Sequence, residues 1–199
     1  MSTPAEKSSG ALANWLIFLL ILVIGYLFYK YGLQAAGPEP TQHHAVGATM
    51  SKFRVEPLLG DATGLEREDL LDHVTLINFW GPWCGWCMIE MPHLDAIRQK
   101  YQGNDVFRLV AISYPAASTE DLRSESAAAL ARINVSLPVH VDPQGTTQNG
   151  FSQVSGWDGG LPAAVLVDRA GVIRGVWIGY GKNNAEQMQA VIEQVLAEG

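Results

Sequence analysis

Hydrophobic residues follow two different patterns along the chain. From Ala11 to Tyr29 the sequence reads ALANWLIFLLILVIGYLFY, and Asn14 is its one strongly polar side chain. From residue 51 onward, short runs rich in Val, Ile and Leu alternate with longer segments in which apolar residues recur every three to four positions. The first pattern is typical of a helix surrounded by lipid, and the second of a domain in which strands alternate with helices.

The alternation beyond residue 51 predicts an α/β domain. Strands are expected at 52–59, 74–80, 106–112, 138–141, 163–167 and 172–180, and helices at 84–101, 119–133 and 183–196, with one helical turn at 146–151. The run from Val74 to Trp80 is almost continuously apolar, which is typical of a central strand covered on both faces. The last two strands flank a turn sequence and are expected to form a hairpin. This order of elements predicts a mixed central sheet flanked by helices.

The N-terminal apolar stretch is long enough to cross a membrane. At a rise of 1.5 Å per residue it spans roughly 28 Å, close to the thickness of the hydrocarbon layer. The alternatives are a buried core helix, which at this length would carry a polar face, and a cleaved signal peptide. A signal peptide has a shorter apolar region and a small-residue cleavage site, and none is visible around Gln34 to Ala36. We therefore predict an uncleaved signal-anchor helix.

These features divide the chain into four parts. They are a cytoplasmic tail at 1–10, a transmembrane helix at 11–31, a flexible linker at 32–50 and the α/β domain at 51–199. Lysines lie on both sides of the apolar stretch, so the positive-inside rule does not decide its orientation. A short tail before a large domain favours export, which places the domain in the periplasm. The linker holds His43 and His44, but adjacent histidines in a flexible segment supply few fixed metal ligands.

Charge and cysteine content narrow the function. The formal net charge of −7 over 199 residues argues against nucleic acid as a partner, because phosphate binding requires clustered Lys and Arg. Two cysteines are too few for a scaffold held together by disulfides. Their close spacing indicates a redox pair or half of a metal site.

The two cysteines, Cys84 and Cys87, lie where the predicted strand 74–80 gives way to a helix. The free N–H groups and the dipole at a helix N-terminus favour a thiolate on Cys84, which makes it the expected nucleophile of thiol–disulfide exchange. Cys87 is expected to close a redox-active disulfide with Cys84 and to expel a bound partner. A zinc site is disfavoured because the chain has no second Cys pair, and no other cofactor is expected. Binding of Cu(I) by the dithiol stays open.

The run LINFWGPWCGWC, the Gly-Leu-Pro sequence ending at Pro162 before the predicted hairpin, and the final helix resemble the thioredoxin fold. With its N-terminal anchor, the chain is similar to membrane-anchored thioredoxin-like thiol–disulfide oxidoreductases of the TlpA/ResA/CcmG type. The resemblance covers about residues 51–199. It implies that Pro162 is the cis-proline facing the dithiol, with the backbone of Leu161 within reach of a substrate strand. The alternative is an ordinary trans proline in a turn.

The resemblance also implies a proton-transfer role for Glu90, which lies three residues after Cys87 on nearly the same helix face. ResA-like proteins carry a buried glutamate at this position. A carboxyl in apolar surroundings has a raised pKa and can hand a proton to a departing thiolate. Thioredoxin itself has a buried Asp where this chain has Asn78, so Glu90 is expected to take over that role. The alternative for Glu90 is a solvated charge on the helix surface.

The remaining residues of the motif are expected to shape the site. Trp83 and Trp86 flank the dithiol and, with Gly85, are expected to form an apolar contact surface in the substrate groove. Pro92 is expected to kink the helix, because proline removes a backbone hydrogen bond.

Taken together, these residues predict a membrane-tethered protein thiol–disulfide oxidoreductase that works as a reductase in the periplasm. By resemblance, its clients are apocytochrome c thiols or other exported proteins with an unwanted disulfide, and a membrane protein donates the electrons. CcmG-type proteins carry an acidic residue just after the cis-proline, whereas this chain has Ala163 and Ala164. Two alternatives use the same cysteines, namely a periplasmic dithiol oxidase and a copper-binding or copper-chaperone module.

Overall fold

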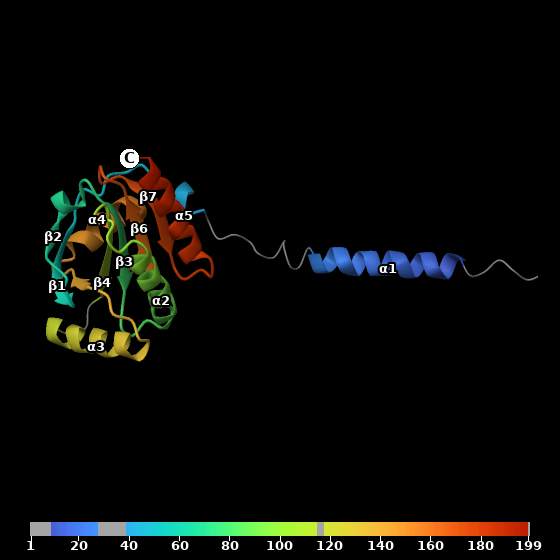
Figure 1. Ribbon diagram of the computed structural model, residues 1–199, viewed down its shortest axis with the longest axis horizontal. Coiled ribbons are helices and arrows are strands. Elements are labelled where there is room, and N and C mark those ends of the chain that lie inside the picture. The colour runs from blue at the N-terminus through green and yellow to red at the C-terminus, as the bar shows by residue number, and fades with distance from the viewer. Residues whose placement is uncertain (1–8, 28–38, 115–117, 199) are drawn as a thin grey trace, which may run out of the picture. The chain divides into compact units, whose positions relative to one another are not determined.

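A computed structural model of the chain describes residues 9–27, 39–114 and 118–198 (Figure 1). The chain divides into two units, residues 1–37 and 38–199, and each is described by itself. The first unit contains helix α1, Ser9–Leu27, whose described side chains from 13 onward are exposed. Within the described part of the chain, no helix combines the length and the apolar character needed to cross a bilayer. The predicted tail at 1–8 and the end of the predicted span at 28–31 lie outside the described residues.

The second unit is built on one mixed sheet. Its strands among the described residues are β1 Arg54–Leu59, β2 Leu65–Glu66, β3 Val74–Trp80, β4 Phe107–Ser113, β5 Val139–Val141, β6 Ala163–Val167 and β7 Ile173–Ile178. Their order across the sheet is β2-β1-β5-β4-β3-β6-β7. Strand β4 runs parallel to both β3 and β5, and the other pairs are antiparallel. All seven residues of β3 are buried, as expected for a central strand.

Helices cover both faces of this sheet. They are α2 Gly85–Lys100, α3 Thr119–Arg132, α4 Thr146–Ser155 and α5 Asn184–Ala197, with short 3₁₀ turns η2 Pro40–Gln42 and η3 Arg67–Leu70. Apolar residues of α2, α3 and α5 share one core cluster with one face of β3, which includes Leu76 and Trp80. Ile77 and Phe79, on the other face, pack with Phe151 of α4 and with Trp157. The α/β fold predicted from the alternation of strands and helices is therefore confirmed.

One predicted element is longer than expected. The single turn predicted at 146–151 is a helix of ten residues, α4. The Asp142 carboxylate accepts hydrogen bonds from the backbone N–H groups of Thr146 and Gln148, both at 2.9 Å, and so satisfies free donors at the start of α4. Gly156 ends the helix in the left-handed conformation.

The second half of the predicted linker belongs to the folded unit, which corrects the boundary drawn at residue 51. Met50 and Ala45 are buried. The Gly47 N–H donates to Ile173 O at 2.9 Å, and the Met50 N–H donates to Gly171 O at the same distance. This segment pairs with the β6–β7 hairpin through its backbone, and a sequence without an apolar period gives no sign of such pairing. Residues 32–38 lie outside the described part of the chain.

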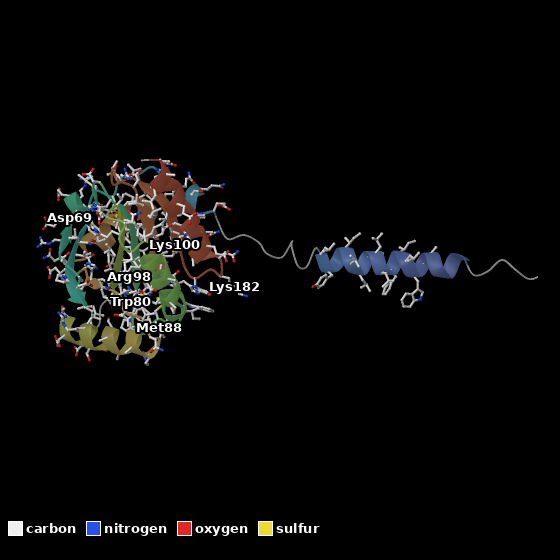
Figure 2. All side chains as sticks on the ribbon, viewed as in Figure 1. Asp69, Trp80, Met88, Arg98, Lys100 and Lys182 are labelled. Atoms are coloured by element: carbon white, nitrogen blue, oxygen red, sulfur yellow. A yellow bond between two sulfur atoms is a disulfide. The ribbon has the colours of Figure 1, made fainter. Side chains whose placement is uncertain are left out.

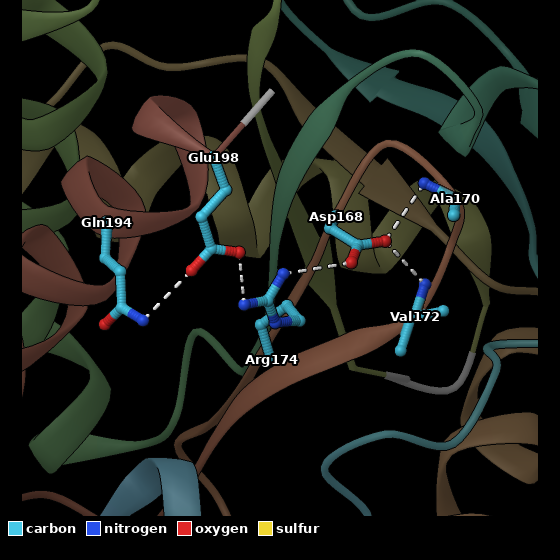
Figure 3. Close-up of polar contacts among 6 residues, drawn as sticks. All are labelled: Asp168, Ala170, Val172, Arg174, Gln194 and Glu198. Atoms are coloured by element: carbon cyan, nitrogen blue, oxygen red, sulfur yellow. Dashed lines mark hydrogen bonds and ion pairs between the residues drawn. The ribbon is translucent and has the colours of Figure 1, made fainter.

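A network of charged groups fastens the β6–β7 hairpin to the end of α5 (Figure 3). The Asp168 carboxylate accepts from the N–H groups of Ala170 and Val172, both at 3.0 Å, and closes the turn. Arg174 donates to Asp168 at 3.2 Å and to Glu198 at 2.5 Å. The hairpin and α5 together carry the loop that precedes α5, where Lys182 lies at the surface (Figure 2).

Candidate active site

The two cysteines form a disulfide at the start of α2. The distance between the Cys84 and Cys87 Cα atoms is 5.2 Å. Strand β3 ends at Trp80, and a buried turn through Gly81 leads to Cys84, the N-cap residue of α2. A Cβ at residue 81 would lie 2.9 Å from the ring of Trp83, so a side chain there would force this exposed ring to move. The turn thus places Cys84 at the N-terminus of the helix, as the sequence predicted.

The two sulfur-bearing residues differ in their environment. Cys84 is 6% exposed and Cys87 1% exposed, so a partner reaches Cys84 more easily. The Cys84 Sγ also accepts a hydrogen bond from the Cys87 N–H at 3.2 Å. In the reduced chain this N–H group and the positive end of the helix dipole stabilise a thiolate on Cys84.

Glu90 is buried one turn beyond the disulfide. It is 4% exposed, and its Oε2 accepts a hydrogen bond from Asn78 Nδ2 at 3.1 Å. Burial raises the pKa of Glu90 to about 7, while hydrogen bonds from the side chains of Asn78 and Asn184 oppose the rise. A carboxyl with this pKa can both hold and release a proton near neutral pH. The alternative of a solvated charge on the helix surface is therefore wrong.

Asn78 lies on β3 directly beneath this carboxyl. It is completely buried, and its Nδ2 also donates to Ala163 O at 3.4 Å. Its Oδ1 is buried without a hydrogen-bond partner among the described residues. Asn78 therefore joins Glu90 on α2 to the first residue of β6 through a neutral amide.

The peptide bond between Leu161 and Pro162 is cis. In the register of β3 and β6, Phe79 pairs with Ala163, so Pro162 lies beside the end of β3 from which the turn to Cys84 departs. Leu161 is partly buried and packs against both core clusters. The position that the resemblance gave to these two residues agrees with this register.

Exposed aromatic rings surround the disulfide. Trp83 is 66% exposed and Trp86 59% exposed. The Trp86 ring stacks on Tyr180, with centroids 5.1 Å apart and planes inclined by 14°. Gly85, between the cysteines, has open space where a Cβ would point. We call Trp83, Trp86 and Tyr180 the aromatic surface.

Two residues of this site were not predicted from the sequence. Tyr180 and Asn184 come from the loop and helix that follow β7, about ninety residues away from the cysteines along the chain. The sequence carries only a weak sign of them, namely a Gly-Tyr-Gly segment shortly before the two asparagines at the start of the last helix. Pro92 lies inside α2 on the exposed side, away from the disulfide network.

Neither a metal site nor a cavity accompanies the dithiol among the described residues. In the described part of the chain, no group of three or more His, Cys, Asp or Glu side chains is arranged to hold a metal ion. A cavity of about 330 Å³ lies at the ends of β4 and β5, lined in part by Tyr114 and Asp142. It contains none of the residues that the sequence singled out.

Comparison with known proteins agrees with this geometry. Residues 46–176 match the AhpC/TSA family. The thioredoxin-like protein YneN of Bacillus subtilis is 26% identical over 173 residues, which cover 84% of this chain and 91% of that protein. The thiol-disulfide oxidoreductase ResA of Geobacillus thermodenitrificans is 28% identical over 167 residues, covering 82% and 84%. A crystal structure described as the thiol:disulfide interchange protein DsbE of Chlorobium tepidum superposes with a TM-score of 0.60 at 25% identity, covering 76% and 97%.

Proposed function

The chain belongs to the AhpC/TSA family and is a thioredoxin-like thiol–disulfide oxidoreductase of the ResA/TlpA/DsbE type, and from this premise we propose that it reduces disulfides in exported proteins. The observation that carries the proposal is the disulfide at the start of α2, with Cys84 its more accessible member, and the buried Glu90, of pKa about 7, one turn beyond Cys87. Cys84 is the attacking thiolate, Cys87 the resolving thiol and Glu90 the group that holds the proton.

The proposed reaction has two steps that balance. The Cys84 thiolate attacks one sulfur of the client disulfide, so that a mixed disulfide forms and the other client sulfur leaves as a thiolate. The Cys87 thiol then loses its proton to the Glu90 carboxylate and attacks Cys84 Sγ, releasing the second client sulfur. The client gains two electrons and leaves as two thiolates, which take one proton from Glu90 and one from water, and the protein ends as the Cys84–Cys87 disulfide. A membrane dithiol protein returns the electrons.

The aromatic surface and the Leu161–Pro162 segment are the proposed walls of the client groove. Trp83 and Trp86 offer apolar area beside Cys84, which suits an unfolded client segment. The backbone of Leu161 is proposed to pair with that segment, as in other proteins of this fold. The proposed clients are apocytochrome c or other exported proteins that must keep free thiols.

The proposed location is the outer face of the cytoplasmic membrane. Residues 11–31 are proposed as the anchor, because the sequence from Ala11 to Tyr29 carries no charge. Protection of the C-terminal domain from protease in intact cells, and its cleavage after the outer membrane is opened, tests this arrangement. A domain cleaved only after lysis of the cytoplasmic membrane refutes it.

The direction of electron flow has a direct test. Titration of the Cys84–Cys87 pair against glutathione is expected to give a potential near the thioredoxin end of the fold, about −270 mV. A value near −120 mV, typical of strong oxidants, refutes the reductase and favours the oxidase. Clients are identified by trapping, because a Cys87→Ala variant cannot resolve the mixed disulfide on Cys84. The matched Cys84→Ala variant must trap nothing.

A further inference from the structure

The loop between α4 and Leu161 is fastened to the core by one side chain. We call residues 156–160, which read GWDGG, the Trp157 loop. Trp157 is 4% exposed, and its ring packs against Phe79 of β3 and Phe151 of α4, with centroids 4.7 Å and 5.4 Å away. The indole therefore lies inside the core, although the residues on both sides of it in the sequence are exposed.

The Trp157 loop holds both backbone polar groups of Gly160. The indole N–H of Trp157 donates to Gly160 O at 2.8 Å. The Asp158 carboxylate accepts from the Gly160 N–H at 3.0 Å. Gly160 comes directly before Leu161, so the carbonyl that Trp157 binds belongs to the peptide group that joins these two residues. Because a peptide group is planar, Trp157 sets the orientation of the whole group.

This orientation decides where the Leu161 N–H points. The Gly160–Leu161 bond is trans, since the cis bond of this segment is the next one, Leu161–Pro162. In a trans peptide group the N–H points opposite to the C=O, so the Leu161 N–H points away from Trp157. Neither this N–H nor the Leu161 carbonyl has a hydrogen-bond partner in the part of the chain that the structure describes.

The backbone of Pro162 has no group left for a client. Proline has no N–H, and the Pro162 carbonyl accepts from the Gly179 N–H at 2.8 Å. The Gly179 carbonyl accepts in turn from Asn184 Nδ2 at 2.9 Å, and a Cβ at Gly181 would lie 2.3 Å from Asn184 Oδ1. The segment between β7 and α5 thus holds the Pro162 carbonyl. Of these two residues, only Leu161 offers an unpaired N–H and C=O to a client strand.

From these contacts we propose that Trp157 is a positioning residue for the client, because it holds the Leu161 N–H in the direction that pairing with a client strand requires. The inference deepens the proposed function and rests on it, since it assigns the residue that orients the proposed pairing group. Pro162 lies beside the end of β3 that leads to Cys84, so a strand paired with Leu161 passes next to the dithiol. The feature recognised is the backbone of an extended segment, whatever its side chains.

The first test measures reduction of a disulfide-bridged peptide by the full chain in detergent micelles. Trp157→Phe keeps an aromatic ring in the core and removes the N–H. It is expected to raise KM for the peptide about fivefold, the change typical of one lost hydrogen bond, with kcat unchanged. Asp158→Ala leaves the core intact, because Asp158 is exposed, and frees the Gly160 N–H. It is expected to raise KM as well.

Two controls separate positioning from general damage. Trp177→Phe is the matched variant, because Trp177 is also 4% exposed and its Nε1 has no hydrogen-bond partner among the described residues. It is expected to keep the wild-type KM. Ellman's reagent is a small disulfide without a peptide backbone, so its rate of reduction is expected to be the same in the wild type and in the variants.

The second test does not depend on the direction of electron flow. In a Cys87→Ala background, a peptide with one activated cysteine is joined to Cys84, and exchange of the Leu161 amide hydrogen is followed by ¹⁵N NMR. The bound peptide is expected to slow this exchange roughly tenfold, because the N–H then has a partner. The slowing is expected to be smaller when Trp157→Phe is added.

The outcomes distinguish this inference from the proposed function. A raised KM in Trp157→Phe and Asp158→Ala, with both controls unchanged, supports the positioning role. It is overturned by an unchanged KM in Trp157→Phe, by an equal rise in Trp177→Phe, by a matching loss of the Ellman rate, or by a Leu161 amide that the bound peptide does not protect. A redox titration that favours the oxidase refutes the proposed reductase, and protection of the Leu161 amide then still decides the role of Trp157.

Discussion

Replacing the buried carboxyl of Glu90 by an amide is expected to change how the stability of the oxidised protein depends on pH. Glu90→Gln keeps the volume and the hydrogen-bonding capacity but removes the charge. The folded chain binds the Glu90 proton more tightly than the unfolded chain does, because the pKa is raised from 4.5 to about 7. The contribution of the protonated Glu90 carboxyl to the free energy of unfolding is therefore complete below pH 4.5 and is lost as the pH rises to about 7.

The size of the loss follows from the two pKa values. At 1.36 kcal/mol per pH unit, a pKa raised from 4.5 to about 7 corresponds to about 3 kcal/mol at alkaline pH. The free energy of unfolding of the wild type is therefore expected to fall by about 3 kcal/mol more than that of Glu90→Gln between about pH 4 and pH 8. At the alkaline end the variant is expected to be the more stable protein.

The measurement is urea unfolding of both oxidised full chains in mild detergent, followed by tryptophan fluorescence at several pH values. Other buried groups that titrate, such as Asp142, whose pKa is raised mainly by burial, are present in both proteins and cancel in the difference. Two stability curves that run parallel across this pH range refute the assignment of a buried, protonatable carboxyl to Glu90. The assignment is also refuted if the free energy of unfolding of the wild type rises with pH relative to that of Glu90→Gln, because the change then has the opposite sign.

Three further changes test other parts of the structure. After reduction, iodoacetamide is expected to modify Cys84 before Cys87, because Cys87 is nearly inaccessible, and peptide mass spectrometry that finds the reverse order contradicts the assigned nucleophile. Gly150→Ala is expected to destabilise the fold by about 1–3 kcal/mol in urea unfolding, since its Cβ would lie 2.5 Å from Lys52 O. The control Gly85→Ala meets open space and should cost nothing. Asp168→Ala is expected to lower stability by about 2 kcal/mol through the lost turn bonds, whereas Gln194→Ala should stay within about 0.5 kcal/mol.

Local patterns were enough to locate the centre of this fold. Strand β3 was predicted with its observed bounds because five of its seven residues are apolar and most of these are β-branched or aromatic, with only Thr75 and Asn78 polar. The dithiol could be placed for a similar reason, since a strand that leads into Cys84 and a helix that follows it are both visible nearby in the sequence. The burial of Glu90 was expected from a resemblance, because a lone glutamate on a helix gives no physical sign of its surroundings.

What escaped prediction depends on contacts between distant segments. The segment 39–50 was assigned to a linker because its backbone, and not an apolar period, holds it to the β6–β7 hairpin. Asn184 and Tyr180 were missed because their neighbours Glu90 and Trp86 belong to another part of the chain. Helix α4 begins where it was predicted, at Thr146, but continues to Ser155, because the segment 152–155 reads SQVS and carries no clear apolar period before Gly156 ends the helix.

The close approach of Gly181 to Asn184 also constrains how this family of sequences can evolve. With 2.3 Å between a Cβ at position 181 and Asn184 Oδ1, a side chain at 181 requires the amide at 184 to move or to be replaced, whereas position 184 can change while glycine stays at 181. A lineage that gains a side chain at 181 is therefore expected to lose the hydrogen bond from Asn184 to Gly179 O as well. Among relatives, a residue other than glycine at 181 should accompany a residue other than asparagine at 184.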